Sequence, residues 1–314
     1  MKKIVITGGA GMIGSNLTEV LLERDNEIIC IDNFYSGGRK NVENFLANPN
    51  YRLLEWDVVK PFDLEINEVD EIYHLAAPAS PVAYQRDPIF TLRTIVTGTD
   101  NALDCARRHN AKILVTSTSE IYGQPLVHPQ SEEYLGNVST TGIRACYDEG
   151  KRCSETFCAE YRRIFGTDVK IARLFNTFGP YMDIDDGRVV SEFIVNMLRD
   201  EPLPVFGDGT QTRAFCYVAD TIRGLIALME SDESGPVNIG NPIEMQINEF
   251  LKHVENCMGK KAKIKWGDLP QDDPLQRCPD ISLAKEKLNW QPEVSLEDGL
   301  KKTIEYFRDV ISIN

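Results

Sequence analysis

A tyrosine and a lysine four residues apart are the pair whose types and spacing point most directly to chemistry. Tyr147 and Lys151 lie in the segment YDEGK, and this spacing places both side chains on one face of a helix. A free tyrosine titrates near pH ~10, which is too high for a base at neutral pH. A neighbouring ammonium group favours the phenolate and lowers the pKa, so Tyr147 is a candidate general base. The spacing alone is a weak signal, because a surface tyrosine beside a solvated lysine would show it too.

A second cluster of candidates lies upstream in TSTSEIYG, at Thr116–Gly123. The apolar run Lys112–Ser117 leads into it, and ligands bind at the carboxyl edge of a parallel sheet. Thr118 can hydrogen-bond the hydroxyl group on which Tyr147 would act. Glu120 can serve as an acid or a base, or can merely cap the turn. The two clusters together, in this order, are more specific than either one alone.

The glycine-rich segment TGGAGMIG, at Thr7–Gly14, directly follows the first apolar run of the chain. Gly8, Gly11 and Gly14 are spaced three apart, which suits a tight turn, close approach to a pyrophosphate and close packing of helix on strand. The N-terminus of the following helix would offer free N–H groups and a partial positive charge to phosphates. The segment predicts a dinucleotide site, and the alternative is a purely structural glycine turn.

An aspartate at the end of the second apolar run, IICID, indicates which dinucleotide would bind. The carboxylate of Asp32 can accept both ribose hydroxyls of NAD and would repel a 2′-phosphate, although a solvated aspartate remains the alternative. The predicted coenzyme is therefore NAD, whose positive nicotinamide ring would further favour the phenolate of Tyr147. Asp57, after a third apolar run, is a plausible adenine contact, although an aspartate at a strand end is more often a cap.

These candidates need a scaffold, and in the first 175 or so residues apolar runs alternate with helical patterns. The predicted strands are Ile4–Thr7, Glu27–Ile31, Arg52–Trp56, Glu71–Leu75, Lys112–Ser117 and Val169–Arg173, and the predicted helices include Met12–Arg24, Ile89–His109 and Ala145–Phe165. Several runs are almost continuously apolar, as in parallel strands that are covered on both faces. The sequence therefore predicts an α/β fold with a Rossmann-type, doubly wound parallel sheet.

The residues after 175 follow a different pattern, with short strands among helices and most of the prolines. Strands are predicted at 203–206, 215–218, 237–240 and 263–266, and the helix Leu296–Val310 closes the chain. This pattern predicts a smaller C-terminal α/β lobe. We expect residues 1–175 to form the NAD-binding Rossmann domain and residues 176–314 to form the substrate-binding lobe, with some exchange of chain between them.

Composition excludes several classes of protein. The chain has 314 residues, with 34 Lys and Arg against 48 Asp and Glu, and a net charge of −14. No basic run would form a nucleic-acid face or favour an anionic membrane, and no apolar stretch approaches the roughly 20 residues of a membrane helix. The start, MKKIVITGGAG, predicts a strand rather than a targeting segment. Eight scattered cysteines and four histidines predict free thiols, a cytoplasmic protein and no metal site.

In whole motifs the sequence resembles the extended short-chain dehydrogenase/reductase family, which contains the NAD-dependent epimerases and dehydratases. The resemblance runs nearly end to end, through TGGAGMIG, IDNFYSG, WDVV, YHLAAPASP, TSTSEIYG, VHPQSE, RACYDEGKR, FNTFGP, DDGRVVSEFI, VFGDGTQTRAFCYV and QDDPLQRCPDI. The glycine and YxxxK motifs identify only the superfamily. The strings RACYDEGKR, DGRVVS and QTRAF most resemble the branch that decarboxylates UDP-glucuronate to UDP-xylose.

The resemblance also implies roles for individual residues. Tyr147 would be the base, assisted by Lys151 and Thr118. The implied NAD contacts are Gly8, Gly11, Met12, Ile13, Asp32, Asn33, Ser36, Gly37, Asp57, Val58, Leu75, Thr94, Thr116, Tyr147, Lys151, Thr177 and Arg188. The implied nucleotide-sugar contacts are Asn176, Arg213 and Arg277. Both arginines suit a diphosphate or a carboxylate through forked hydrogen bonds, and the alternative for them is surface ion pairs.

The implied chemistry is a decarboxylation in which tightly held NAD is reduced and reoxidised within one cycle. Tyr147 would take a proton from the sugar as hydride leaves C4, which places a ketone β to the C6 carboxylate. Carbon dioxide can then depart, and protonation at C5 with return of hydride to C4 gives a UDP-pentose. Related 4,6-dehydratases have an aspartate acid where this chain has Ser119, and serine cannot act as a comparable acid. Glu120 or a held water can handle the C5 proton, and the sequence leaves this choice open.

Several positions depart from the family pattern. Ile95 stands where the family usually has asparagine, and Tyr181 and Asp183 stand where it tends to have arginine and histidine. Asp183, Asp185 and Asp186 together place three negative charges near a pocket for an anionic sugar. Unless these carboxylates point to solvent, like-charge repulsion would disfavour a carboxylated substrate.

These departures leave a second function open, another NAD-dependent nucleotide-sugar 4-epimerase or 4,6-dehydratase. A non-catalytic NAD-sensing or scaffold protein is a third, but it would leave the Thr118, Tyr147 and Lys151 set unexplained. Relatives pair two long helices from each subunit, so the resemblance implies a homodimer or a dimer of dimers through Ile89–His109 and Ala145–Phe165. Apolar faces on these helices could equally belong to the core.

Overall fold

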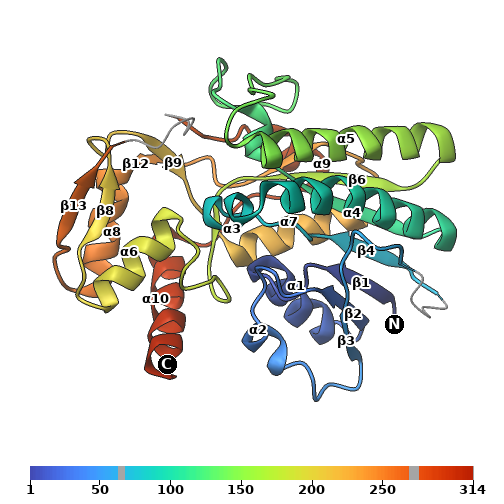
Figure 1. The fold of residues 1–314 in the computed structure, drawn as a ribbon, viewed down its shortest axis with the longest axis horizontal. Coiled ribbons are helices and arrows are strands. Elements are labelled where there is room, and N and C mark those ends of the chain that lie inside the picture. The colour runs from blue at the N-terminus through green and yellow to red at the C-terminus, as the bar shows by residue number, and fades with distance from the viewer. Residues whose placement is uncertain (63–67, 269–275, 314) are drawn as a thin grey trace.

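Seven parallel strands form the main sheet of the computed structural model, which describes residues 1–62, 68–268 and 276–313 (Figure 1). The sheet order is β11–β6–β5–β4–β1–β2–β3. These strands are β1 (Lys3–Thr7), β2 (Glu27–Asp32), β3 (Tyr51–Glu55), β4 (Glu71–His74), β5 (Lys112–Thr118), β6 (Val169–Leu174) and β11 (Val237–Ile239). The predicted doubly wound parallel sheet is confirmed, and the six strands expected before residue 175 shift by no more than one residue at either end.

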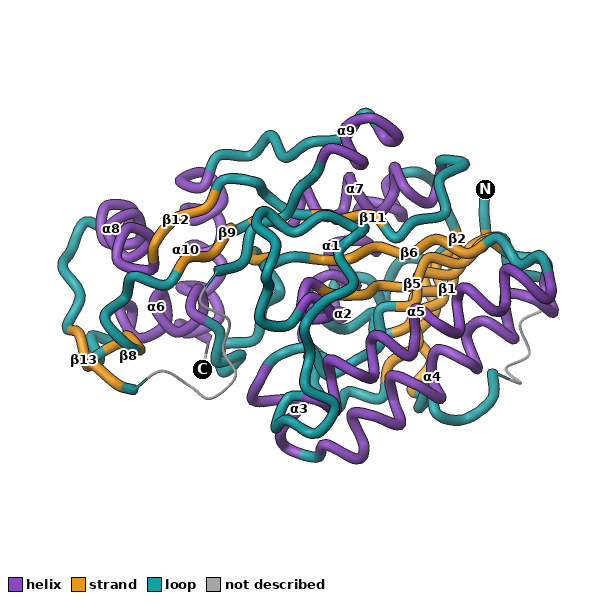
Figure 2. Tube along the Cα trace, turned by 90° about the horizontal axis from the view of Figure 1, so that it is seen from above, coloured by secondary structure: helices purple, strands orange, loops and turns teal. Residues whose placement is uncertain are grey.

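Two pairs of helices cover the two faces of this sheet. The helices α4 (Pro88–His109) and α5 (Ala145–Phe165) lie side by side on one face, and α1 (Met12–Glu23) and α7 (Val218–Glu230) pack on the other. Figure 2 shows α4 and α5 on one side of the strands and α7 on the opposite side. Because both faces are covered, β5 is buried along nearly its whole length, and Ile113, Leu114 and Val115 form a continuous apolar run within it.

Local sequence explains where the two long helices begin and end. The carboxylate of Asp87 caps α4 by accepting the N–H of Phe90 at 2.9 Å, and Pro88 occupies the first turn. Asn110 ends α4 in the left-handed conformation, and Gly166 ends α5 in the same way. These signals determine where α4 and α5 begin and end, and the first turn of each helix lines the cavity between the lobes.

The second lobe consists of short strand pairs and helices, at the left of Figure 1. In it, β8 (Leu203–Phe206) pairs with β13 (Ile264–Gly267), and β9 (Thr212–Ala214) pairs with β12 (Glu244–Gln246). The helices of this lobe are α6 (Val189–Leu198), α8 (Ile247–Met258) and α10 (Leu296–Ile313). None of the helices in the described part of the chain is long and apolar enough to cross a membrane.

Two strands expected after residue 175 need correction. The strand expected at 237–240 is β11, but it pairs with β6 in the main sheet and not within the second lobe. The strand expected at 215–218 is only β10 (Cys216–Tyr217), which pairs with β7 (Thr177–Phe178), and Val218 already begins α7. A short apolar run cannot show where strand gives way to helix, because either conformation can bury it. The remaining elements are α2 (Lys40–Glu43), α3 (Pro81–Arg86), the 3-10 helix η1 (Ser119–Tyr122) and α9 (Ser282–Leu288).

Replacing Gly14 by alanine tests the close packing of α1 on the turn that precedes it. A Cβ at Gly14 would lie 2.4 Å from the carbonyl oxygen of Gly8 and 2.6 Å from the Cα of Gly9, so the backbone would have to move. We expect Gly14→Ala to lower the free energy of unfolding by about 1–3 kcal/mol, the usual cost of overpacking, as measured by urea unfolding. Gly267→Ala is the control, because its nearest neighbour is the ring of Phe206 at 3.2 Å. Equal effects of the two variants would contradict this interpretation.

Candidate active site

A cavity of about 980 Å³ lies between the lobes, at the carboxyl ends of β1, β2, β4 and β5. The predicted site residues on its wall are Gly8, Gly11, Met12, Ile13, Asp32, Asn33, Ser36, Gly37, Val58, Leu75, Thr94, Thr116, Thr118, Ser119, Glu120, Tyr147, Lys151, Asn176, Thr177, Arg188, Arg213 and Arg277. Asp57 is the exception among the predicted residues. It is flanked by the lining residues Trp56 and Val58, but its carboxylate accepts the N–H of Val59 at 3.0 Å, as a turn cap does.

The glycine-rich turn and α1 form a cradle that fits a dinucleotide. Gly8 has a φ of +70°, and a Cβ there would lie 2.8 Å from the backbone of Ala76. Because Gly11 is the N-cap of α1, no side chain occupies the first N–H groups of the helix, which suit a phosphate. Asp32 ends β2 beside this turn, and its Oδ2 accepts the N–H of Ala10 at 3.0 Å. Burial raises the pKa of Asp32. The hydrogen bonds that its carboxylate accepts from backbone N–H groups act in the opposite direction.

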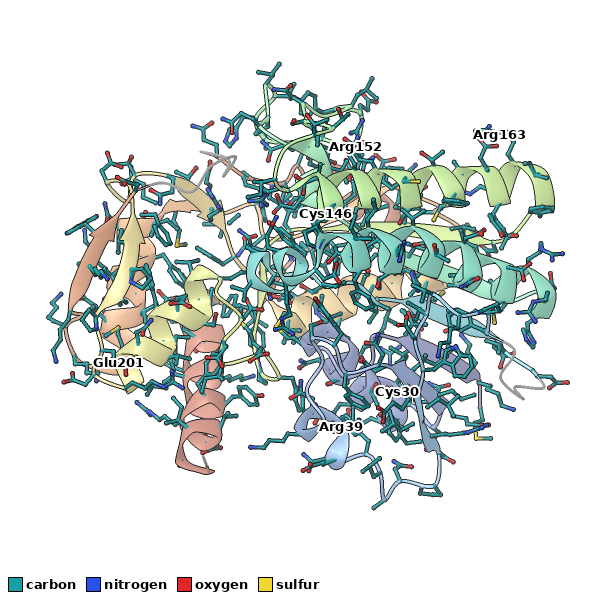
Figure 3. All side chains as sticks on the ribbon, viewed as in Figure 1. Cys30, Arg39, Cys146, Arg152, Arg163 and Glu201 are labelled. Carbon is teal, nitrogen blue, oxygen red and sulfur yellow. The ribbon has the colours of Figure 1, made fainter. Side chains whose placement is uncertain are left out.

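The start of α5 lies at the junction of the two lobes, where Figure 3 labels Cys146. Tyr147 lies in this first turn with 6% of its surface exposed, and its ring stacks on Tyr84 with centroids 5.1 Å apart. Its hydroxyl is hydrogen-bonded to the side chain of Thr118, so the fold brings these two predicted residues together. Burial raises the pKa of Tyr147 to about 12, although the bond to Thr118 and the charge of Arg188 act in the opposite direction.

Lys151 lies one turn further along α5 and is buried. Its Nζ donates to the carbonyl oxygen of Thr116 at 2.7 Å, and burial lowers its pKa to about 8. In the chain itself the pKa of Tyr147 lies above its ordinary value, because the cost of burying the phenolate outweighs the opposing effects of Thr118 and Arg188. The expected lowering by Lys151 together with the nicotinamide ring stays a prediction. What Lys151 contributes directly is a hydrogen bond that fixes the end of β5.

Glu120 follows Thr118 in η1 and lies between two arginines. Arg277 contacts both oxygens of its carboxylate, with a distance of 2.7 Å to Oε2, and Arg144 also binds Oε2. Burial alone would raise the pKa of Glu120, but the charges of Arg277 and Arg144 outweigh it and keep the pKa below its ordinary value. Glu120 is therefore a carboxylate at neutral pH, a form that can accept a proton or hold a water but has no proton to donate.

The other predicted sugar contacts reach the cavity near the second lobe. Arg213 in β9 is buried, and its Nη1 donates to the carbonyl oxygen of Thr212 at 2.8 Å. Asn176 precedes β7, and its carbonyl oxygen accepts the N–H of Cys216 at 2.9 Å. Of the motif QDDPLQRCPDI, residues 271–275 lie outside the described residues. Within the described ranges, no three side chains of His, Cys, Asp or Glu gather as a metal site requires.

The acidic residues after FNTFGP are less repulsive to an anion than their number suggests. Asp186 is buried and paired with Arg188, with a distance of 2.8 Å between Oδ2 and Nη2. Asp183 and Asp185 are exposed, so water and salt screen their charges. The departure at Ile95 has a packing role, because its side chain is buried beside Tyr84 and Tyr147. A carboxylated ligand is therefore not excluded by these positions.

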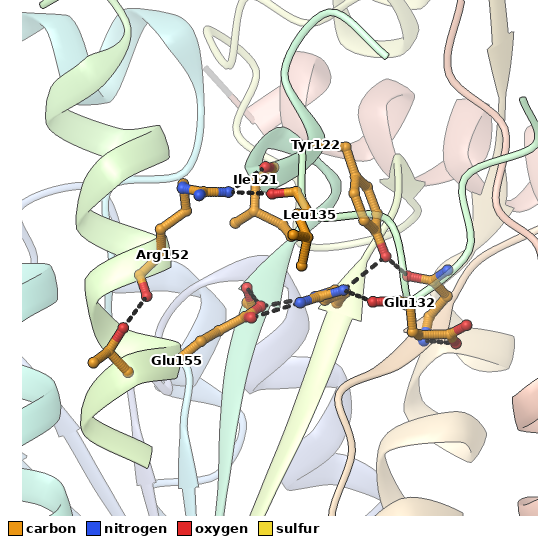
Figure 4. A network of polar contacts seen from close by, with 10 residues as sticks. Ile121, Tyr122, Glu132, Leu135, Arg152 and Glu155 are labelled. Carbon is orange, nitrogen blue, oxygen red and sulfur yellow. Dashed lines mark hydrogen bonds and ion pairs between the residues drawn. The ribbon is translucent and has the colours of Figure 1, made fainter. Parts of the chain in front are cut away.

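A buried polar network that the sequence did not predict begins at the end of β5 (Figure 4). Ser117 donates to Glu155 at 2.5 Å, and Glu155 pairs with Arg173 through two contacts of 2.7 and 2.9 Å. Arg173 then donates to the hydroxyl oxygen of Tyr122 at 3.0 Å, and Tyr122 donates to the amide oxygen of Asn238 at 2.8 Å. These contacts join residues far apart in the chain, so no local sequence signal indicates them.

The same network continues to the segment that carries Arg277. The amide nitrogen of Asn238 donates to the carbonyl oxygens of Gln130 and Asp280 at 2.9 and 3.0 Å. The side-chain oxygen of Gln130 accepts the N–H of Cys278 at 2.9 Å. The position of Arg277 against Glu120 is thus set by bonds that begin beside Thr116 and Thr118.

This combination of a parallel sheet, a glycine-rich turn and a buried tyrosine is the architecture of the short-chain dehydrogenases/reductases. A model of the NAD dependent epimerase/dehydratase family matches residues 4–240, and the chain belongs to this family. The resemblance found in the sequence motifs is therefore confirmed.

Three relatives illustrate the likeness. UDP-glucuronic acid decarboxylase 1 of Xenopus tropicalis is 52% identical over 307 residues, which cover 98% of this chain and 72% of that protein. The protein of the same name from Arabidopsis thaliana is 50% identical over 309 residues, which cover 98% of this chain and 70% of that protein. The structure of UDP-glucuronic acid 4-epimerase from Bacillus cereus, in complex with UDP-glucuronic acid and NAD, matches with a TM-score of 0.88 and 29% identity over 98% of this chain and 99% of that one.

Asp148 is a buried acid beside the site that the sequence analysis did not single out. It follows Tyr147, is 7% exposed, and its Oδ1 has no hydrogen-bond partner among the described residues. Burial, followed by the charge of Glu120, raises the pKa of Asp148 to about 7. The folded chain thus binds this proton more tightly than the unfolded chain, in which an aspartate titrates near 3.8.

This raised pKa predicts that stability falls as pH rises between about pH 4 and about pH 7, the window in which only the folded chain keeps the proton. We expect Asp148→Asn to be more stable than the parent above about pH 7 and similar to it below about pH 4. Melting temperatures measured across this range check the expectation. Asp309→Asn, at an exposed position of α10, is the control. A difference between Asp148→Asn and the parent that does not grow with pH would contradict it.

Proposed function

We propose that the chain is a NAD-dependent UDP-glucuronate decarboxylase that forms UDP-xylose and leaves NAD unchanged overall. The observation that carries the proposal is the identity of about half of all residues, over 98% of the chain, with UDP-glucuronic acid decarboxylases. The site supports it, because Tyr147 and Thr118 meet in a cavity that also contains a dinucleotide cradle. Asp32 and the glycine-rich turn suit NAD as the coenzyme.

In the first step, Tyr147 takes the proton of the C4 hydroxyl while the hydride leaves C4. Thr118 is hydrogen-bonded to Tyr147 and is placed to orient that hydroxyl. Bound NAD supplies the hydride acceptor and a positive charge beside the phenol. That charge is needed, because burial keeps the pKa of Tyr147 at about 12 in the chain by itself. Lys151 holds the end of β5, and with it Thr118, in place.

In the second step, the C6 carboxylate leaves as carbon dioxide, and the electrons of the C5–C6 bond pass into an enolate at O4. Tyr147, which now carries the proton, stabilises the enolate oxygen by donating to it. Ser119 lies where a dehydratase needs an acid, and this step requires none. Because Glu120 is a carboxylate, we assign it to hold the water that delivers the proton to C5. Arg213 and Arg277 offer the cations for a diphosphate or carboxylate.

A UDP-glucuronate 4-epimerase is the second candidate, favoured by the structural match to the Bacillus cereus enzyme. Both reactions begin with oxidation at C4. They differ in whether the C5–C6 bond then breaks or the 4-keto sugar is reduced from its other face. The lower identity, 29% against 50% or more, makes this the weaker candidate.

The test is to incubate the purified chain with UDP-glucuronate and no added NADH. We expect release of carbon dioxide and formation of UDP-xylose. Carbon-13 NMR measures both products. Tyr147→Phe should lower kcat by about 10²–10⁴, the usual contribution of a general base, and leave the amount of bound NAD unchanged. Tyr134→Phe is the matched control, because it removes a hydroxyl that accepts the N–H of Leu126 outside the cavity wall.

Two results would contradict the proposal. UDP-galacturonate with no carbon dioxide would identify the epimerase, and no turnover of UDP-glucuronate would exclude both reactions. UDP-glucose, which has no C6 carboxylate, should release no carbon dioxide and controls for contaminating activities.

We further propose a cytoplasmic homodimer, or a dimer of dimers, in which residues 1–175 supply most of the NAD site and residues 176–314 most of the sugar site. The outer face of α5 supports the assembly. It carries a shallow hollow lined by Phe157, Tyr161, Ile164 and Phe165, and Ile164 is 65% exposed. Pairing α4 and α5 of two copies would cover this face in the manner that the family resemblance implies.

Light scattering tests the dimer. The parent should have at least twice the chain mass of 35.4 kDa, and Ile164→Asp should shift it towards the monomer, because a charge on a buried apolar face is costly. Leu126→Asp, at a 79% exposed position after η1, should leave the mass unchanged. A monomeric parent would rule the assembly out.

A further inference from the structure

The segment 180–188, which leads into α6 of the second lobe, is tied to the first lobe by two asparagine side chains. The Nδ2 of Asn16 donates to the carbonyl oxygens of Pro180, at 3.0 Å, and Met12, at 2.8 Å. The Nδ2 of Asn41 donates to the carbonyl oxygens of Tyr181, at 3.1 Å, and Ala10, at 3.0 Å. Each amide therefore bridges two backbone segments that are more than a hundred residues apart in the sequence.

The first-lobe partners of both amides belong to the dinucleotide cradle. Ala10 lies within the glycine-rich turn and also donates its N–H to Asp32. Met12 begins α1, whose N-terminus is the phosphate site, and it lines the cavity. A separation of the segment 180–188 from the first lobe would thus open the cavity at the place where the pyrophosphate is expected.

Tyr181 adds a third tie at the position where the family pattern has arginine. Its hydroxyl is hydrogen-bonded to the side chain of Asn44, which follows α2, and its ring lies 5.9 Å from that of Tyr306 in α10. Its φ is +65°, in the left-handed region that a tyrosine rarely adopts. Contacts to α2 on one side and α10 on the other keep the residue in this conformation.

The far end of the segment rests on α3, on the opposite side of the cavity. A Cβ at Gly187 would lie 2.5 Å from Val82, so the backbone passes directly against this side chain. Arg86 of α3 in turn donates to the carbonyl oxygen of Tyr35 at 3.2 Å, in the loop after β2. The segment 180–188, α3 and the loop after β2 therefore enclose the same stretch of the cavity wall.

We propose that Asn16, Asn41 and Tyr181 form a latch between the lobes that retains the coenzyme through the whole catalytic cycle. The need for retention rests on the proposed function. If the reduced coenzyme leaves after decarboxylation, one UDP-glucuronate and one NAD⁺ yield one UDP-4-keto-pentose, one carbon dioxide and one NADH, and no UDP-xylose forms. The latch residues are positioning residues, because they bind backbone carbonyls and a neighbouring side chain and leave the reacting atoms to Tyr147.

Coenzyme retention can be measured without any substrate. The parent, the double variant Asn16→Ala/Asn41→Ala and Tyr181→Phe are loaded with NADH and mixed with excess NAD, and the loss of bound NADH fluorescence gives the dissociation rate. The double variant loses four hydrogen bonds, two of which reach the segment 180–188, so we expect its rate to rise by about tenfold or more. Tyr181→Phe loses only the bond to Asn44 and should dissociate NADH about two- to fivefold faster.

Asn137→Ala is the matched control for the asparagine variants. Its amide also donates to a backbone carbonyl, that of Gln124, at 3.1 Å, but the bond lies outside the cavity wall. This variant should release NADH at the parent rate. Should the double variant fail to fold, Tyr181→Phe still decides the question, since it removes a single hydroxyl.

A second readout follows the products from UDP-glucuronate. The latch variants should release more UDP-4-keto-pentose and NADH per carbon dioxide than the parent or Asn137→Ala. NADH dissociation at the parent rate in both the double variant and Tyr181→Phe would overturn the latch, even where all variants decarboxylate normally. Faster dissociation in a protein that turns over no UDP-glucuronate would support the latch and contradict the proposed function.

Discussion

The burial of ionisable groups at the carboxyl edge of the parallel sheet is the constraint on which the site depends. A charge removed from water needs a fixed partner, or the group reverts to its neutral form. Glu120 has two arginines and remains a carboxylate, whereas Tyr147 has the neutral hydroxyl of Thr118 and remains a phenol. Under the proposed function, the cationic ring of the coenzyme would supply the further positive charge that favours the phenolate of Tyr147.

The pairing of Glu120 with Arg277 places a demand on the whole fold. The two residues are 157 positions apart. Removal of Glu120 would leave the buried Arg277 without its carboxylate partner, and removal of Arg277 would leave Glu120 with Arg144 alone. The hydrogen bonds that run from Ser117 through Arg173 and Asn238 to the backbone near Arg277 hold the two residues together. They connect β5, β6 and β11, so the return of the chain to the main sheet after residue 175 is also what brings an arginine to the active site.

The parts of the structure that the sequence predicted correctly depend on local signals. Strand and helix periodicity, the glycine-rich turn and the acid at Asp32 each lie within a few residues, and so they predicted the sheet and the cradle. The raised pKa of Tyr147 in the chain itself could not be predicted, because it depends on burial, which the spacing of residues in α5 does not reveal. The same holds for Arg144 and Asp148, which stand inside a motif that was recognised, yet whose importance comes from a neighbour, Glu120, in another element.

The departures from the family pattern become intelligible when they are taken with the geometry of the cavity. An arginine near a pyrophosphate would attract the ligand directly and would lose strength in salt. At that position this chain has Tyr181, a neutral side chain that contacts Asn44 and Tyr306 and leaves its carbonyl to Asn41. Binding strength is thereby moved from a contact with the ligand to contacts between the two lobes that surround it. Under the proposed function, a coenzyme that is reduced and reoxidised in place gains from this arrangement, because contacts between the lobes enclose the oxidised and the reduced form alike and do not depend on an ion pair that salt would weaken.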